Sequence, residues 1–214
     1  SCRFNDGDSS YMTKSFGTPT DNKKFTLSMW VKRGVLGATQ NLMGSWADSD
    51  HHTIARFYSD DTISFYDWDN PNEGSIYTNR VYRDCSSWYH LVFIWDSANS
   101  TEADRLQIWT NGVRETSLKG ITDYPATTWT PSCNTSGVDI EIGRRSDGGY
   151  FDGYMAEVCF IDGLALTPTS FGEFDEDSPT IWKPKDVSGL TFGNNGFYLD
   201  FEASDNLGND ANGG

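Results

Sequence analysis

The chain has 214 residues, 14% of them aromatic, which excludes a disordered chain because disordered segments lack the apolar side chains for a core. A net charge of −15 disfavours nucleic acid and anionic lipid as partners, because both are polyanions. No stretch is apolar for long enough to cross a membrane, so no membrane insertion is expected.

Short runs in which apolar and polar residues alternate, separated by turn residues, predict β-strands along the whole chain. In residues 25–32, for example, Phe25, Leu27, Met29 and Val31 fall on one face of a strand. Residues 88–95 are apolar on both faces, as in a central sandwich strand. In chain order, the predicted strands cover residues 3–4, 11–13, 25–32, 53–58, 62–66, 88–95, 105–110, 138–142, 154–161 and 196–201.

The sequence also predicts two turns and one helix between these strands. Asn111-Gly112 is a strong hairpin signal, because a type I′ turn needs positive φ at both central positions. Asp60-Asp61 predicts a second hairpin turn, and residues 168–174 predict a short helix that begins at a proline. Many short strands with a single short helix predict an all-β fold, a two-sheet antiparallel β-sandwich of jelly-roll type.

The expected domain organisation is a sandwich over residues 1–202 and a flexible linker over residues 203–214, which are rich in Asn, Asp and Gly. A chain that begins at Ser1 without a signal peptide is expected to be a processed product or part of a longer protein. Cys2, Cys85, Cys133 and Cys159 form no CxxC motif, and the sequence leaves disulfides and buried free thiols equally open.

Aromatic residues outside the core alternation are the best candidates for ligand binding. The C–H face of a sugar stacks on an aromatic ring while polar neighbours take its hydroxyl groups. The alternative is that each ring covers an edge of the core. The candidate ligand-binding residues are Trp46, Tyr66, Trp68, Asp69, Trp129 and Tyr150. Among the histidines, His90 is expected to be structural, and His51 and His52 to form a turn.

Three ordered groups of segments resemble the laminin-G-like branch of the concanavalin-A-like lectin/glucanase superfamily. They include Phe25-Thr26-Leu27-Ser28-Met29-Trp30-Val31-Lys32, Trp88-Tyr89-His90-Leu91-Val92-Phe93 and Phe151-Asp152-Gly153-Tyr154. The resemblance implies a concanavalin-A-like sandwich that binds a glycan or a cell-surface receptor and is not an enzyme. It also implies a possible Ca²⁺, for which Asp6 and Asp8 are the candidate ligands; a simple tight turn is the alternative.

The same superfamily includes β-glucan hydrolases, which place their carboxylates in an E-x-D-x-x-E pattern on one strand. The nearest pattern here, Asp139-Ile140-Glu141, has the wrong order and lacks the second Glu. We therefore expect both carboxylates to be solvated on an outer sheet face, with a glycoside hydrolase as the alternative.

The C-terminal half also resembles structural proteins of tailed bacteriophages, through residues 160–168, 171–173, 182–184 and 195–199. This resemblance implies a tail-fibre or other virion component at the virion surface or in another extracellular location. Other virion subunits would then be partners. It also leaves a second function open, an assembly or decoration domain that binds no glycan.

Overall fold

The computed structural model describes residues 1–120, 122–146 and 148–212. Almost all regular structure is β, with three short 3-10 turns at Asp6–Asp8 (η1), Glu102–Asp104 (η2) and Pro168–Ser170 (η3). The strands are β1 (Cys2–Phe4), β2 (Met12–Ser15), β3 (Lys24–Arg33), β4 (Gln40–Trp46), β5 (His51–Phe57), β6 (Ile63–Asp69), β7 (Asn72–Tyr77), β8 (Tyr89–Asp96), β9 (Leu106–Thr110), β10 (Val113–Arg114), β11 (Asp139–Ile142), β12 (Gly153–Asp162), β13 (Gly172–Phe174), β14 (Trp182–Pro184) and β15 (Phe197–Leu199).

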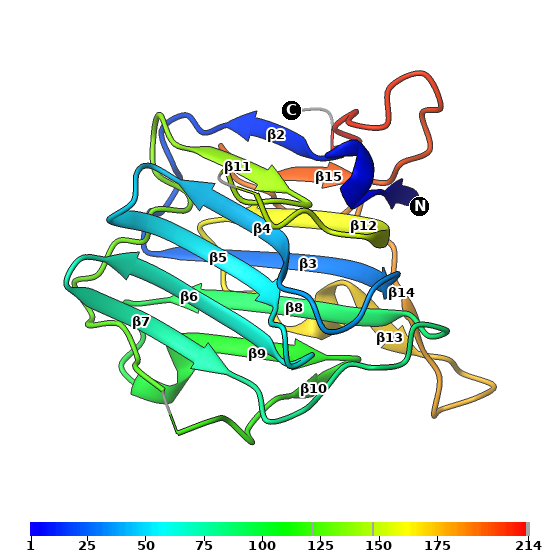
Figure 1. Cartoon of the computed structure of the whole chain (residues 1–214), viewed down its shortest axis with the longest axis horizontal. Coiled ribbons are helices and arrows are strands. Elements are labelled where there is room, and N and C mark those ends of the chain that lie inside the picture. Colours follow the sequence, from blue (N-terminus) through cyan, green and yellow to red (C-terminus); the bar gives the residue numbers. More distant parts are fainter. Residues whose placement is uncertain (121, 147, 213–214) are drawn as a thin grey trace.

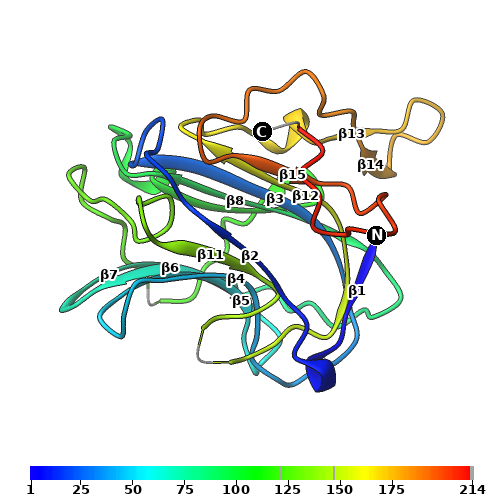
Figure 2. The same cartoon turned by 90° about the horizontal axis from the view of Figure 1, so that it is seen from above.

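Two antiparallel sheets pack face to face, which confirms the predicted β-sandwich (Figures 1 and 2). The six-stranded sheet has the order β2-β11-β4-β5-β6-β7. The seven-stranded sheet has the order β1-β12-β3-β8-β9-β10, with β15 also paired to β12. No helix in the described ranges is long and apolar enough to span a bilayer.

Aromatic rings fill the space between the sheets. Phe65 of the six-stranded sheet meets Phe93 of the other sheet edge-on, with their ring centroids 5.3 Å apart. Phe25 stacks on Phe160 at 5.4 Å within the seven-stranded sheet. These residues come from the predicted alternating runs, because period-2 alternation turns every second side chain towards the partner sheet.

A second, smaller core lies on the opposite side of the seven-stranded sheet. Val92 and Ile94 of β8 and Ile161 of β12 contact Phe171, Val187 and Phe192 from the C-terminal part of the chain. In Figure 2 this part, which includes β13 and β14, lies against the outer side of that sheet. The seven-stranded sheet is therefore covered on both faces, as the two-sided apolar run at residues 88–95 predicts.

The structure corrects several predicted elements. The helix expected at residues 168–174 is the 3-10 turn η3 followed by strand β13, because Gly172 to Phe174 pair with Trp182 to Pro184. His51 and His52 do not form a turn but begin β5, which pairs with β4 and β6. Strands β4 and β7 were not predicted, since neither has a clean alternation, and strand pairing with β5 and β6 defines them.

The segment expected to be a linker makes contacts with the sandwich. Asp210 accepts a hydrogen bond from the Tyr198 backbone N–H and pairs with Lys14 at 3.2 Å. The Ala211 N–H donates to the Tyr198 carbonyl at 2.8 Å. Residues 213–214 of this predicted segment lie outside the described residues, and the boundary at residue 202 stays a prediction.

All four cysteines are free thiols. Cys2, Cys133 and Cys159 are buried, and burial raises the pKa of the Cys133 and Cys159 thiols. Of the two states that the sequence leaves open, this structure shows the free thiol.

His90 has the structural role expected of it and joins β8 to the β13–β14 hairpin. The Trp182 indole can only donate, and its Nε1 lies 2.9 Å from His90 Nδ1, so Nδ1 is the acceptor. The proton therefore sits on Nε2, which donates to Ser28 Oγ at 2.9 Å. Burial lowers the His90 pKa to about 3, so the ring stays neutral.

Replacing His90 should loosen the hairpin. His90→Ala removes the acceptor for Trp182 and a ring that stacks on Trp30 and Trp182, and we expect it to lower the unfolding free energy by roughly 2–4 kcal/mol. Trp182→Phe keeps a ring and removes one donor, and should cost roughly 1–2 kcal/mol. Urea unfolding followed by circular dichroism measures both; equal losses in the two variants would contradict a packing role for the imidazole.

Candidate functional site

The candidate site is the outer face of the six-stranded sheet, the face turned towards the viewer in Figure 1. Phe65 of β6 and Phe57 of β5 belong to the core. Because side chains alternate along a strand, their neighbours Tyr66 and Arg56 point the other way. The C-terminal part of the chain that covers the other sheet lies on the opposite side of the sandwich (Figure 2).

Aromatic side chains from neighbouring strands form a row across this face. Trp46, His52 and Trp68 are partners in the register of β4, β5 and β6. The rings of Trp46 and His52 stack with centroids 4.5 Å apart, and His52 meets Tyr66 edge-on at 5.8 Å. Trp46 and Trp68 are partly exposed, while Tyr66 is buried beneath its neighbours.

An arginine packs between two of the tyrosines. The Arg56 guanidinium carbon lies 4.9 Å from the ring centroids of both Tyr58 and Tyr66. Arg56 Nε donates to Ser64 Oγ at 3.1 Å, which orients the side chain. Tyr58 keeps 38% of its surface exposed, so this end of the face offers an accessible ring beside a positive charge.

Part of the loop after β11 lies over β4 and adds two more arginines. Gly44 makes this close approach possible, because a Cβ at position 44 would lie 2.9 Å from the Arg144 carbonyl oxygen and from Arg145 Cα. Arg145 lies over the Trp46 ring at 4.9 Å, and Arg144 lies over Tyr11 at 3.3 Å. Arg144 Nη1 also donates to the Tyr150 hydroxyl at 3.2 Å.

The hydroxyl groups of Tyr66 and Tyr77 stay neutral. Burial raises the pKa of Tyr66, and the charge of Arg56 opposes that rise. Burial, together with the nearby Glu73 carboxylate, raises the pKa of Tyr77 to about 12. Both phenols can therefore donate or accept hydrogen bonds near neutral pH.

The structure divides the predicted ligand-binding set in two. Trp46, Tyr66, Trp68 and Tyr150 belong to the outer face, with Tyr66 mostly covered. Asp69 and Trp129 instead line a hollow beside the β6–β7 turn, together with Asn72 and Thr128.

Sequence reasoning missed Arg56, Tyr58, His52 and Arg145, although all four belong to the outer face. Arg56 and Tyr58 share the alternation of the strand predicted at residues 53–58, which was a usable signal. The position of Arg145 over Trp46 had no local signal, because it follows from the loop passing over Gly44.

Trp129 is held at the edge of the core and is only partly exposed. Its Nε1 donates to Asp67 Oδ2 at 2.7 Å, and Asp67 Oδ1 accepts from Thr53 Oγ1 at 2.5 Å and from the Ser132 N–H at 2.8 Å. This arrangement favours the alternative reading of Trp129, a ring that covers the core edge.

Asp6 and Asp8 form the 3-10 turn η1, and Asp8 accepts a hydrogen bond from Asn5 at 2.6 Å. The part of the chain that the structure describes brings together no group of three or more His, Cys, Asp or Glu side chains able to hold a metal ion. Calcium at Asp6 and Asp8 stays a prediction.

The expectation of two solvated carboxylates on β11 is half wrong. Asp139 is exposed and accepts from Ser15 Oγ at 2.5 Å. Glu141 is buried, with 5% of its surface exposed, because Arg144 pairs with it at 2.5 Å and covers it. Its burial depends on the loop after β11, which the alternation of β11 does not reveal.

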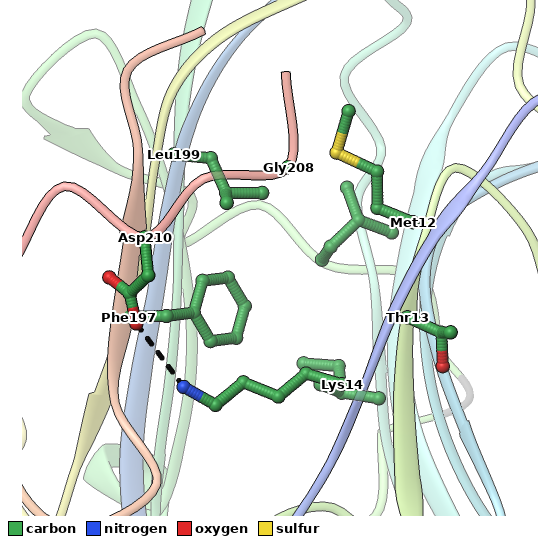
Figure 3. A pocket seen from close by; sticks show the side chains of 9 residues that line it. Met12, Thr13, Lys14, Phe197, Leu199, Gly208 and Asp210 are labelled. Atoms are coloured by element: carbon green, nitrogen blue, oxygen red, sulfur yellow. Dashed lines mark hydrogen bonds and ion pairs between the residues drawn. The ribbon is translucent and has the colours of Figure 1, made fainter. Parts of the chain in front are cut away.

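A separate cavity of about 90 Å³ opens between the edges of the two sheets. Figure 3 shows Met12 and Lys14 of β2 facing Phe197 and Leu199 of β15, with an ion pair between Lys14 and Asp210 across the opening. The small size and apolar lining of this cavity are typical of a gap left by imperfect packing at the edge of the core. The cavity offers few polar groups that could bind sugar hydroxyl groups.

The comparisons with known proteins agree with this fold. The sequence profile of the concanavalin A-like lectin/glucanases superfamily (Laminin_G_3) matches residues 5–170, so the chain belongs to this superfamily. A comparison with curated proteins found no match.

Solved structures share the fold at low sequence identity. A native heptameric SAP-like pentraxin from Limulus polyphemus is 16% identical with a TM-score of 0.51, over 73% of this chain and 71% of the pentraxin. Domains LG4-5 of the mouse laminin α1 chain are 11% identical with a TM-score of 0.54, over 90% of this chain and 46% of that one. Tailspike protein 2 of an Escherichia coli O157:H7 bacteriophage is 12% identical with a TM-score of 0.51, over 79% of this chain and 23% of the tailspike. The fold is thus lectin-like.

The Asp67 network predicts a pH-dependent stability. Burial raises the Asp67 pKa from 3.8 to about 6. Between these pH values the native state binds more protons than the unfolded state. The contribution of Asp67 to the free energy of unfolding therefore falls as the pH rises from 4 to 6, and it stays low above pH 6. The Asp67→Asn variant cannot titrate here. The difference in unfolding free energy between wild type and variant should therefore change by roughly 2 kcal/mol between pH 4 and pH 7. Urea unfolding at several pH values measures it, and a constant difference would contradict the burial effect.

Proposed function

We propose that this domain is a non-catalytic glycan-binding domain that holds its sugar on the outer face of the six-stranded sheet. The observation that carries the proposal is the accessible aromatic surface of this face, with Trp46 and Trp68 partly exposed near one end and Tyr58, directly after β5, exposed at the other. Sugar rings stack on such surfaces because their C–H faces are apolar.

The polar groups around these rings suit the hydroxyl groups of a sugar. Tyr77, Glu73 and Arg56 belong to the same face and offer both donors and acceptors. They sit on paired strands, so little conformational entropy is lost when a ligand binds. The lectin-like fold of the superfamily supports the same function.

The two carboxylates of β11, Asp139 and Glu141, support binding over catalysis. A retaining glycosidase needs two carboxyl groups roughly 5 Å apart, one of them protonated as the acid. Glu141 pairs with Arg144, and Asp139 accepts from Ser15. Both carboxylates thus serve local structure, and neither is poised as an acid or a nucleophile.

The proposal also includes where the domain is located. We place the domain on a virion surface or another extracellular protein, on the strength of the sequence resemblance of residues 160–199 to tailed-phage structural proteins. Labelling of intact virions by an antibody raised against the domain would test this placement.

An assembly domain that contacts other virion subunits is the second candidate function. The outer face is rich in Trp, Tyr and Arg, the residues that dominate protein interfaces as well as sugar sites. A glycan assay separates the two candidates.

A glycan array probed with wild type and with Trp68→Ala tests the glycan-binding function. Trp68 offers a partly exposed ring, and we expect its loss to weaken binding by roughly fivefold or more, since ring stacking contributes about 1 kcal/mol or more. Tyr154→Ala is the matched control, because Tyr154 is an exposed ring under an arginine on the other sheet. It should bind as wild type does.

Each array is run with Ca²⁺ and with chelator. Loss of binding in chelator would support a calcium requirement, and Asp8→Asn would then test the predicted ligand. Absence of binding to every glycan in both conditions would contradict the glycan-binding function and favour the assembly domain.

A further inference from the structure

We infer that the ligand is an acidic oligosaccharide, and that Arg56 binds its carboxylate or sulfate group. The inference rests on the proposed function and adds the chemical class of the sugar. It is carried by the placement of one arginine whose terminal nitrogens have no acceptor among the described residues, while the rest of its side chain is held by the protein.

The Arg56 side chain is fixed before any ligand arrives. Its guanidinium group packs beside the rings of Tyr58 and Tyr66, each 4.9 Å away, and its Nε donates to Ser64 Oγ. Neither terminal nitrogen has a hydrogen-bond acceptor among the described residues, and the side chain is partly exposed. A guanidinium held in this way presents two parallel N–H donors, which match the two oxygens of a carboxylate or sulfate.

The unpaired state of Arg56 is unusual for this chain, in which 31 acidic residues outnumber 16 basic ones. Arg105, also without an ion pair in the described ranges, donates instead to the carbonyls of Asn99 and Pro125. Among the ion pairs between described residues, six arginines pair with carboxylates: Arg3, Arg33, Arg80, Arg83, Arg114 and Arg144.

The acidic residues Asp60 and Asp61, between β5 and β6, and Glu73 of β7 are already bound to other partners. Asp60 pairs with Lys119 at 2.5 Å, and Asp61 pairs with Arg33 and Arg83 at 3.1 and 2.8 Å. Glu73 accepts a hydrogen bond from Tyr77. An external anion could therefore bind Arg56 without displacing an internal carboxylate.

The spacing on the sheet favours an oligosaccharide over a single sugar. Arg56 is the register partner of Ser64, four residues along β6 from Trp68. At about 3.3 Å per residue, this separation is roughly 13 Å. One sugar can place its acidic group at Arg56 and its ring beside Tyr58, while a neighbouring sugar reaches Trp68.

Matched pairs of acidic and neutral ligands test the inference directly. Suitable pairs are polygalacturonate with its methyl ester, sialyllactose with lactose, and chondroitin sulfate with desulfated chondroitin. We expect wild type to bind at least one acidic member roughly tenfold or more tighter than its neutral partner. The carboxylate and sulfate pairs report which anion Arg56 prefers.

Variants of Arg56 assign the preference to this side chain. Arg56→Gln should abolish the difference between the acidic and the neutral member, and Arg56→Lys should keep part of it, because lysine keeps the charge but not the two parallel donors. Arg3→Gln is the control of equal charge change on the other sheet. Thermal melting of each variant verifies that it is folded.

The possible outcomes distinguish failure of this inference from failure of the proposed glycan-binding function. Equal binding of acidic and neutral members, lost in Trp68→Ala, would overturn the acidic class and leave glycan binding intact. An acidic preference that persists in folded Arg56→Gln would overturn the role of Arg56. Binding to no member of any pair would overturn both proposals.

Discussion

The architecture depends on one constraint, the burial of both faces of the seven-stranded sheet. Strand β8 places Leu91 and Phe93 in the main core and Val92 and Ile94 in the second one. A strand that is apolar on both sides must be covered on both sides. One cover is the six-stranded sheet, and the other is the C-terminal part of the chain (Figure 2). The outer face of the six-stranded sheet is the face on which the C-terminal part of the chain does not lie.

The outer face of the six-stranded sheet combines rings on paired strands with arginines from a loop. Its rings stand on paired strands, so their spacing is set by the sheet register and not by a mobile backbone. Yet the loop after β11 reaches over Gly44 and adds Arg144 and Arg145 to the face. The sheet sets the positions of the rings, while this loop adds two arginine side chains beside Tyr11 and Trp46.

Charge distribution distinguishes the outer face from the molecule as a whole. A chain with net charge −15 repels anions at long range, although salt screens this repulsion beyond roughly 10 Å. Arginines held against aromatic rings create a local exception, because the rings keep the guanidinium groups in place and partly dry. An acidic sugar would be recognised at contact distance, by geometry more than by the overall field.

The sequence alone determined the sandwich class, most strands and the structural role of His90, because period-2 alternation and turn residues are local signals. It also identified Trp46 and Trp68 as site candidates from their polar surroundings. Only the tertiary structure decided that Trp129 lies apart from them, that Glu141 is buried, and that Arg56 has no carboxylate partner among the described residues. Each of these depends on strand pairing or loop placement between residues far apart in the chain, and no local pattern encodes which distant side chain will lie alongside.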